Sequence, residues 1–324
     1  MLELRRSDAR RGRRAGMTAL SPRIALLMTL PPLMWAGNAV VGRLMVGSVP
    51  PLTLNLLRWT LAALLLLPLG WRAFARPGEI AQRWRHLLLL GLLGISTYNA
   101  MQYLALVTTT PINVTLIASS GPVWMLAVGA LLYGEHPNRR QLAGAGLSIA
   151  GVLLVIARGD PAALARIEFV AGDLYIIVAI VAWAFYSWML ARPPESMRAP
   201  QRPDWDWAAF LLVQIAFGLV GAGAAFGAEW AAGSPPVVWS GKVAAALAFV
   251  AIGPSIIAYR CWGLGIAAGG PALAAFFANL TPVFAALMSA ALLGEAPRWY
   301  HGVAFALIVA GIVVSSRRAA GART

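Results

Sequence analysis

The sequence has little charge of either sign and few acidic residues. Only 12% of its 324 residues are charged and 60% are hydrophobic, with 12 acidic residues against 26 basic ones. A soluble chain typically carries about twice this share of charged residues. The uncharged segment 24–42 is by itself long enough to cross a hydrocarbon core of about 30 Å. The composition therefore predicts an integral membrane protein whose partners include the lipid bilayer.

Thiols and intramembrane ionisable groups are also scarce. The single cysteine, Cys261, excludes disulfides within the chain and cysteine metal clusters. The histidines, His86, His136 and His301, lie at the ends of the expected helices, and no acidic residue lies near the middle of one. We therefore predict no metal, no cofactor and no catalytic residues. A proton-coupled transporter usually keeps ionisable side chains inside the membrane as a proton relay. Because the expected spans contain no obvious relay, the sequence favours facilitated export or exchange over proton coupling.

The excess of basic residues gives a formal net charge of +14 and raises the possibility of a nucleic-acid partner. However, the basic residues lie between apolar segments and form no patch interleaved with aromatics. We therefore predict no nucleic-acid binding. Residues 1–22 are interpreted as a basic cytoplasmic arm that anionic lipids attract. Met17 is an alternative start, which would remove most of this arm.

Hydropathy predicts an all-α protein with ten transmembrane helices. The expected spans are 23–46, 52–71, 86–108, 112–133, 138–158, 171–191, 207–228, 242–265, 272–293 and 297–316. An even number of spans places both termini on one side. Most basic loop residues lie on that side, whereas Arg158, Arg166, Lys242 and Arg298 lie on the other. The positive-inside rule thus predicts a multi-pass plasma (inner) membrane protein with cytoplasmic termini, including the tail 317–324.

A repeat divides the chain into two halves, 23–158 and 171–316. "PVWMLAVGALLYGE", which begins at Pro122, returns 160 residues later as "PVFAALMSAALLGE", which begins at Pro282. The same offset relates Pro111/Pro271, Glu135/Glu295 and Gly151/Gly311. Because each half contains an odd number of expected spans, five, the second half enters the membrane from the opposite side. Such inverted-topology repeats are typical of secondary transporters.

Two of the repeated prolines fall near the middle of expected spans. Pro122 and Pro282 each remove one backbone hydrogen bond and free the carbonyl four residues earlier, at Ala118 and Ala278. In lipid a freed carbonyl must meet protein or water. Two helix kinks at matching depth therefore indicate a central cavity. The alternative is an incidental kink relieved by a nearby serine.

Arg58 lies about two turns inside the second expected span. An arginine at the bilayer centre costs about 2.5–3.5 kcal/mol on insertion scales. We therefore expect a structural charge held by carbonyls or amides of neighbouring helices. Attraction of a substrate carboxylate is the second interpretation.

Polar and aromatic side chains recur at helical spacing along several spans. Aromatics can serve packing or an interfacial belt, and amides can bond neighbouring helices. Amides at similar depth nevertheless favour a lined cavity, because an unpaired buried amide is costly. The predicted substrate-binding residues are Trp35, Asn38, Tyr98, Asn99, Gln102, Trp183, Tyr186, Tyr259 and Asn279.

Trp35 and Trp183 lie in the equivalent first helices of the two halves. Each is followed three residues later by a polar side chain, Asn38 or Tyr186. Positions three apart share a helix face. We therefore expect the two indoles to form opposite walls of the substrate site, with packing between helices as the alternative.

The chain resembles the EamA-type branch of the drug/metabolite transporter superfamily over about residues 24–316. The resemblance rests on "PPLTLNLLRWTLAALLLLP" with Arg58, on the two Pro-to-Gly-Glu segments, and on the small-residue helices "LAGAGLSIAGVLLV" and "VAFALIVAGIVVSS". It implies two EamA repeats of five helices, with a cavity lined by helices 1, 3, 4, 6, 8 and 9 and with helices 5 and 10 at the periphery. The seventh helix lacks an arginine that matches Arg58, which departs from this pattern.

These features together predict a transporter, not an enzyme. Its substrate is expected to be a small amphipathic metabolite, such as an amino acid or a related compound, exported or facilitated by alternating access. The alternative is a membrane-embedded enzyme acting on lipid or peptide, but no intramembrane acid or histidine is available to activate a nucleophile. The sequence leaves substrate identity, direction, coupling ion and monomer or homodimer state open.

Overall fold

The computed structural model describes residues 21–109, 114, 117–166, 170–293 and 298–316. Most of the predicted basic arm, Pro111, Glu295 and the tail 317–324 lie outside this part of the chain. All the regular secondary structure of the described residues is helical. Eight helical segments are long and apolar enough to cross a membrane, and α8 is a shorter apolar helix. The prediction of an all-α membrane protein is confirmed.

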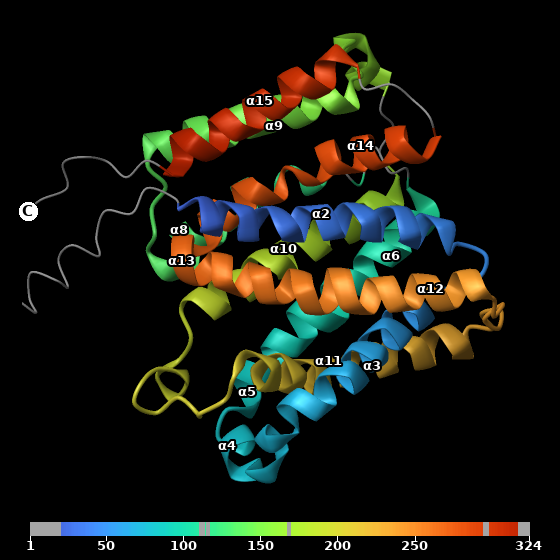
Figure 1. The fold of residues 1–324 in the computed structure, drawn as a ribbon, viewed down its shortest axis with the longest axis vertical. Helices are drawn as coiled ribbons and strands as arrows, with labels where there is room; N and C mark the ends of the chain where they lie inside the picture. The colour runs from blue at the N-terminus through green and yellow to red at the C-terminus, as the bar shows by residue number, and fades with distance from the viewer. Residues whose placement is uncertain (1–20, 110–113, 115–116, 167–169, 294–297, 317–324) are drawn as a thin grey trace, which may run out of the picture.

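The helix bounds follow the expected spans closely in most places (Figure 1). The α-helices are α2 Pro22–Leu44, α3 Pro51–Gly70, α4 Pro77–Ala81, α5 Trp84–Leu90, α6 Tyr98–Thr108, α8 Gly121–Tyr133, α9 Arg139–Ile156, α10 Ala171–Ala191, α11 Trp207–Ala231, α12 Gly241–Val250, α13 Ala258–Ala278, α14 Thr281–Leu293 and α15 Trp299–Ser316. Two π-helical segments, η2 Gly91–Thr97 and η5 Ala251–Ile257, connect α5 to α6 and α12 to α13.

Polar caps define where several helices begin. The side chains of Ser21, Asp206 and Ser240 each accept a backbone N–H from the first turn of α2, α11 and α12. Asn138 and Gln141 form a reciprocal capping box at the start of α9. These bonds satisfy amides that have no partner inside the helix. The sequence therefore encodes the starts of several helices locally.

The fifth helix of each half packs against its equivalent, and the two run antiparallel. A Cβ at Gly144 of α9 would lie 2.7 Å from the carbonyl oxygen of Gly311, and one at Gly151 would lie 2.8 Å from that of Ala304 on α15. Under the 160-residue offset the first pair maps onto the second. The symmetry operation that relates the two halves therefore converts each of these two contacts into the other. Two equivalent helices that run in opposite directions are what an inverted repeat requires.

The second helices of the halves, α3 and α11, are paired in the same way. Gly70 at the end of α3 abuts the backbone of Ala209 near the start of α11. At the opposite ends, the Glu229 carboxylate accepts the backbone N–H groups of Leu52 and Thr53 at 2.8 and 2.7 Å. This pair is therefore also antiparallel, and a carboxylate bonds amides at the positive end of the α3 dipole.

The first helix of each half packs against the third helix of the other half. α2 contacts α13, and α10 contacts α6 and η2. In Figure 1, α2 and the α12–α13 segment lie side by side across the middle of the molecule, whereas α9 and α15 form a separate pair at one edge. The first and third helices, which pack across the two halves, thus form the centre of the molecule.

The helices around Pro122 and Pro282 differ from the expected kinked spans. α8 begins at Gly121 and α14 at Thr281, so each proline lies in the first turn of a new helix and not inside a continuous one. Proline fits there because a first-turn amide needs no partner within the helix. The Ala278 carbonyl, which we expected to be freed, accepts the Thr281 hydroxyl at 2.7 Å.

The boundary between the eighth and ninth expected spans, 242–265 and 272–293, lies at a kink inside α13. The α13 segment consists of two helices that meet at a kink at Gly270, where φ is 81° and ψ is 168°. Glycine tolerates this positive φ without steric cost, and Pro271 then starts a new segment. Because the ninth expected span is itself divided between the end of α13 and α14, the described segments do not establish ten separate spans.

The two π-helical segments occupy equivalent positions of the repeat. Gly91 and Thr97 bound the first, and Ala251 and Ile257, each 160 residues later, bound the second. A π-helical turn contains an extra residue and is frequent at functional sites. Both segments lie beside the polar and aromatic residues described next.

Candidate functional site

Arg58 is the centre of a buried polar network. Its side chain is fully buried, and its Nε donates to the Ser255 hydroxyl at 2.6 Å. Its Nη1 donates to the amide oxygens of Asn38 at 3.1 Å and Asn99 at 2.7 Å and to the Tyr103 hydroxyl at 3.0 Å. One guanidinium on α3 therefore contacts α2, α6 and η5, which belong to both halves.

The network extends through the partners of Arg58. Asn38 Nδ2 donates to Gln102 Oε1 at 3.1 Å, and the Tyr103 hydroxyl donates to Asn38 Oδ1 at 2.8 Å. Asn99 Nδ2 lies 3.2 Å from both the Gly94 carbonyl and the Tyr259 hydroxyl. Five buried or half-buried polar side chains are thus linked by hydrogen bonds around one cation.

The positive charge of Arg58 is not neutralised within the described part of the chain. No carboxylate there forms an ion pair with it; the ion pairs found are Arg76–Glu79, Arg166–Asp160 and Arg192–Glu135. Its Nη2 atom is buried and has no hydrogen-bond partner among the described residues. A guanidinium that has hydrogen bonds but no counter-ion in a low-dielectric interior strongly favours a nearby anion.

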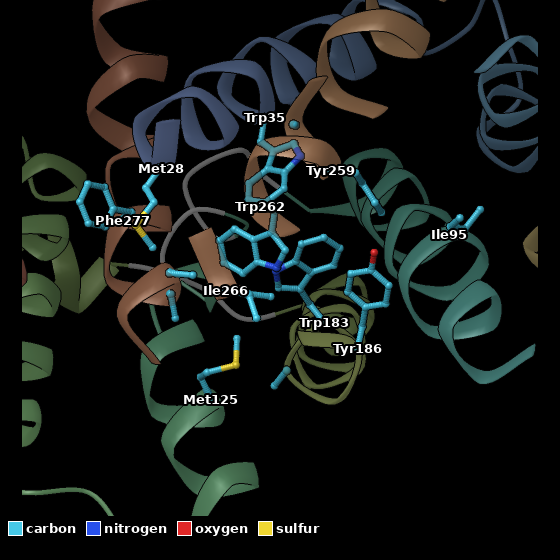
Figure 2. Packing of buried hydrophobic residues seen from close by; sticks show 14 of the residues in the cluster. Met28, Trp35, Ile95, Met125, Trp183, Tyr186, Tyr259, Trp262, Ile266 and Phe277 are labelled. Carbon is cyan, nitrogen blue, oxygen red and sulfur yellow. The ribbon is translucent and has the colours of Figure 1, made fainter. Parts of the chain in front are cut away.

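An aromatic cluster adjoins this network (Figure 2). The Trp183 ring of α10 lies 5.2 Å from Trp35 of α2, with an interplanar angle of 88°, and 5.3 Å from Trp262 of α13. It also stacks on Tyr186 at 4.9 Å and contacts Tyr98 at 4.8 Å. Each such pair contributes about 0.5–1.5 kcal/mol beyond area burial. Aromatic side chains of the two halves thus pack directly against each other at this position.

Tyr259 joins the aromatic cluster to the polar network. Its ring lies 5.3 Å from Trp183 and 5.0 Å from Trp59. Its hydroxyl accepts from Asn99 and donates to the Gly94 carbonyl. An amphipathic ligand would meet apolar rings on one side of this tyrosine and polar groups on the other.

The π segments supply main-chain acceptors to the site. The carbonyl of Gly94 in η2 accepts from Asn99 and Tyr259, and the carbonyl of Pro254 in η5 accepts the Trp35 indole at 3.3 Å. Gly94 and Pro254 are 160 residues apart, so these carbonyls occupy equivalent places in the two halves. The extra residue in each π segment turns them away from regular helical pairing.

A surface pocket of about 200 Å³ lies next to the network. It is formed by the end of α2, the start of α3 and residues 234–236, and Tyr103 contributes to its wall. The Tyr103 hydroxyl also accepts from Arg58, so one side chain separates the pocket from the cation. The Val238 N–H donates to the Ser48 carbonyl at 2.9 Å and ties the two adjoining loops together.

Most of the predicted substrate-binding residues come together in the structure. The residues linked by the bonds and ring contacts above are Trp35, Asn38, Tyr98, Asn99, Gln102, Trp183, Tyr186 and Tyr259. Asn279 is buried at the break between α13 and α14, and its Nδ2 has no partner among the described residues. It therefore lies outside the connected set.

Trp35 and Trp183 do not form separate walls here. The two rings touch edge to face, so a ligand between them would first have to separate them. Repeat symmetry led us to expect the indoles on facing surfaces, but direct ring packing fills that space.

Two contributors on α3 were not predicted as site residues. Trp59 contacts both Arg58 and Tyr259, and Asn55 is buried one turn before Arg58. The spacing of Asn55, Arg58 and Trp59 places them on one helix face, which is a signal that the sequence does contain. The sequence contains no comparable signal for the carbonyls of the π segments, which also contribute to the site.

The fold and this interior define a membrane protein of transporter architecture, with two inverted halves around a shared polar and aromatic centre. The chain belongs to the EamA-like transporter family, whose family model matches residues 22–157 and again 170–317. The two matches coincide with the two halves.

Several relatives found by sequence similarity are named as transporters or exporters. An uncharacterized transporter of Archaeoglobus fulgidus is 28% identical over 90% of this chain and 97% of its own length. The aromatic amino acid exporter YddG of Ancylobacter novellus is 28% identical over 83% of this chain and 89% of its own length. A protein of Streptantibioticus cattleyicolor named "Probable terminal-alkyne amino-acid exporter" is 25% identical over 92% of this chain and 94% of its own length. The chain is thus a membrane transporter by family.

A solved crystal structure has the same fold. It superposes with a TM-score of 0.69 at 25% identity, and the match covers 91% of this chain and 96% of that one. The arrangement of the helices described here is therefore shared over nearly the whole chain.

Proposed function

We infer that this transporter exports or facilitates a small amphipathic metabolite, an amino acid or a related compound, across the plasma membrane. The observation that carries this proposal is the junction at Tyr259, where an aromatic cluster meets a buried polar network. Ligand sites typically combine apolar walls with a few placed polar groups. Two relatives named as amino-acid exporters support the same substrate class.

Alternating access of the two halves is the proposed mechanism. The aromatic cluster contains rings from α2 and α10, the first helices of the two halves, and rings from α6 and α13. Entry of a substrate would separate these rings, and closure would bring them together again. The pocket beside Tyr103 is the proposed route to the side opposite the termini. The distribution of basic loop residues predicts that the termini are cytoplasmic.

The test replaces Trp35 and Trp183 by alanine, one at a time, in purified protein reconstituted into liposomes. We expect counterflow of tryptophan and leucine to fall on the order of tenfold, since each variant removes an indole whose contact with the substrate would contribute about 1 kcal/mol or more. Trp230 is 72% exposed on α11, and Trp230→Ala is the matched control for loss of an indole.

Rates are compared per incorporated protein, and each variant must have a melting temperature well above the assay temperature. If Trp35→Ala and Trp183→Ala transported both amino acids as fast as the Trp230→Ala control, the aromatic cluster would not be the substrate site.

A further inference from the structure

One face of α3 carries three buried residues with unpaired polar atoms. The atoms are Oδ1 of Asn55, Nη2 of Arg58 and Nε1 of Trp59, and none has a hydrogen-bond partner among the described residues. All three residues are at most 1% exposed. Residues three and four apart lie on the same helix face, so the three side chains are neighbours. Buried polar atoms without partners are rare, and three on one face point to a ligand.

The unpaired atoms specify the chemistry of that ligand. Arg58 and Trp59 both offer N–H donors, and the guanidinium carbon lies 5.1 Å from the centre of the Trp59 ring. Donors from a cation and a neighbouring indole suit an oxyanion. Asn55 offers an acceptor one turn earlier, because its Nδ2 already donates to the Ser96 carbonyl. It therefore suits a donor group close to the oxyanion.

Charge selects among the oxyanions. Arg58 is a single cation, and the polar side chains that bond it, those of Asn38, Asn99, Tyr103 and Ser255, are neutral. One guanidinium can neutralise one negative charge, which fits a carboxylate and leaves a phosphate dianion partly uncompensated.

We propose that Asn55, Arg58 and Trp59 bind the head group of an α-amino acid. Arg58 Nη2 and Trp59 Nε1 donate to its carboxylate, and Asn55 Oδ1 accepts from its ammonium. The side chain of the ligand then lies against Tyr259, whose ring is 5.0 Å from Trp59, and reaches the aromatic cluster beyond it. This assignment rests on the proposed function and names the groups that recognise the head group of the substrate.

The test compares ligands that differ only in the head group. Stabilisation of the detergent-solubilised full chain is measured by thermal shift with tryptophan, indole-3-propionate, which lacks the ammonium, and tryptamine, which lacks the carboxylate. The series is repeated with leucine, 4-methylpentanoate and 3-methylbutylamine. We expect the amino acid to bind best, the acid next, and the amine about tenfold to a hundredfold more weakly than the amino acid, since hydrogen bonds to charged groups contribute most. Phenylphosphonate is included as the phosphate-like arm and is expected to bind more weakly than phenylacetate.

Variants assign the effect to residues. Arg58→Met should remove the preference for carboxylates, and Asn55→Leu should remove the advantage of tryptophan over indole-3-propionate. Asn38→Asp retains Arg58 but gives it an internal carboxylate, so this variant should lose tryptophan binding even if Arg58→Met does not fold. Arg43, which donates to the Leu106 carbonyl at 2.9 Å, provides the control Arg43→Gln with unchanged ligand preference.

Several results would overturn the assignment. Equal binding of tryptamine and tryptophan, or undiminished tryptophan binding by Asn38→Asp, would remove Arg58 from the site. Equal binding of indole-3-propionate and tryptophan would remove Asn55, and tighter binding of the phosphonate would exclude a carboxylate. Transport of the amines at the rate of the amino acids would overturn this assignment alone, whereas absence of transport for every compound would instead contradict the proposed function.

Discussion

Arg58 shows how one residue imposes conditions on its surroundings. A charge in the interior requires donors and acceptors from other helices, and the structure provides neutral oxygens at 2.6–3.1 Å. Neutral partners satisfy hydrogen bonds but leave the charge uncompensated. The site therefore retains electrostatic free energy that a carboxylate would release.

Asn38→Asp is expected to stabilise the protein. The new carboxylate would replace the amide oxygen 3.1 Å from Arg58 Nη1, and the Gln102 amide can rotate to donate to it. Charge-assisted hydrogen bonds are about twice as strong as neutral ones, so we expect a gain of about 1 kcal/mol or more. The measurement is the midpoint of thermal unfolding in detergent.

Asn279→Asp is the control for this prediction. Asn279 is 2% exposed but makes no contact with Arg58, so a carboxylate there is buried without a cation and should lower the unfolding temperature. A lower unfolding temperature for Asn38→Asp as well would show that Arg58 does not lack a counter-ion.

At the scale of elements, small residues determine how closely equivalent helices approach. The α9–α15 pair meets through Gly144, Gly151, Ala304 and Gly311, where main-chain atoms of one helix touch the Cα positions of the other. Close backbone contact supplies packing between transmembrane helices, because lipid gives no hydrophobic gain for their association. The stability of this pair therefore depends on the absence of side chains.

Gly144→Val should separate the pair. Its Cβ alone would lie 2.7 Å from the Gly311 carbonyl oxygen and 2.9 Å from the Ser315 Cβ. Overpacking of this kind costs about 1–3 kcal/mol. Gly146 is two residues away and exposed, and a Cβ added there would meet no atom within 4 Å, so Gly146→Val is a matched control. We expect only the Gly144 variant to unfold at lower temperature, and equal unfolding temperatures would contradict this packing.

At the scale of the whole molecule, inversion determines which elements meet at the centre. First and third helices are exchanged between the halves, and the second and fifth helices pair with their own equivalents. The site consequently receives side chains from α2, α3 and α6 of one half and from α10, η5 and α13 of the other. Movement of one half against the other must change this site.

Labelling of single cysteines tests the orientation of this assembly. Cys261 is buried and provides a suitable background. Ala232 and Gln201 are exposed in loops at the end of α11 and before its start. If the termini are cytoplasmic, a membrane-impermeant maleimide should label Ala232→Cys in intact cells but Gln201→Cys only after permeabilisation. The reverse pattern would invert the proposed topology, and labelling in the parent protein is the control.

The amino-acid sequence alone was enough to establish the membrane class, most of the helix bounds, the repeat and the need of Arg58 for interior partners. These properties depend on hydropathy, spacing and the cost of a charge in lipid, all of which are encoded along the chain. The antiparallel pairs α3–α11 and α9–α15 then agree with the inversion that an odd number of spans implies.

Which groups meet in the interior is a property of the folded chain. Ser255 lies 197 residues from Arg58 in sequence, and Trp35 reaches the Pro254 carbonyl across 219 residues, so neither contact follows from local pattern. Helix breaks stand before Pro122 and Pro282 where kinks were expected, and beside Pro282 the Thr281 hydroxyl bonds the Ala278 carbonyl that the break leaves free. The direct contact of Trp35 with Trp183 likewise arises from packing, since rings from distant helices fill whatever space their backbones leave.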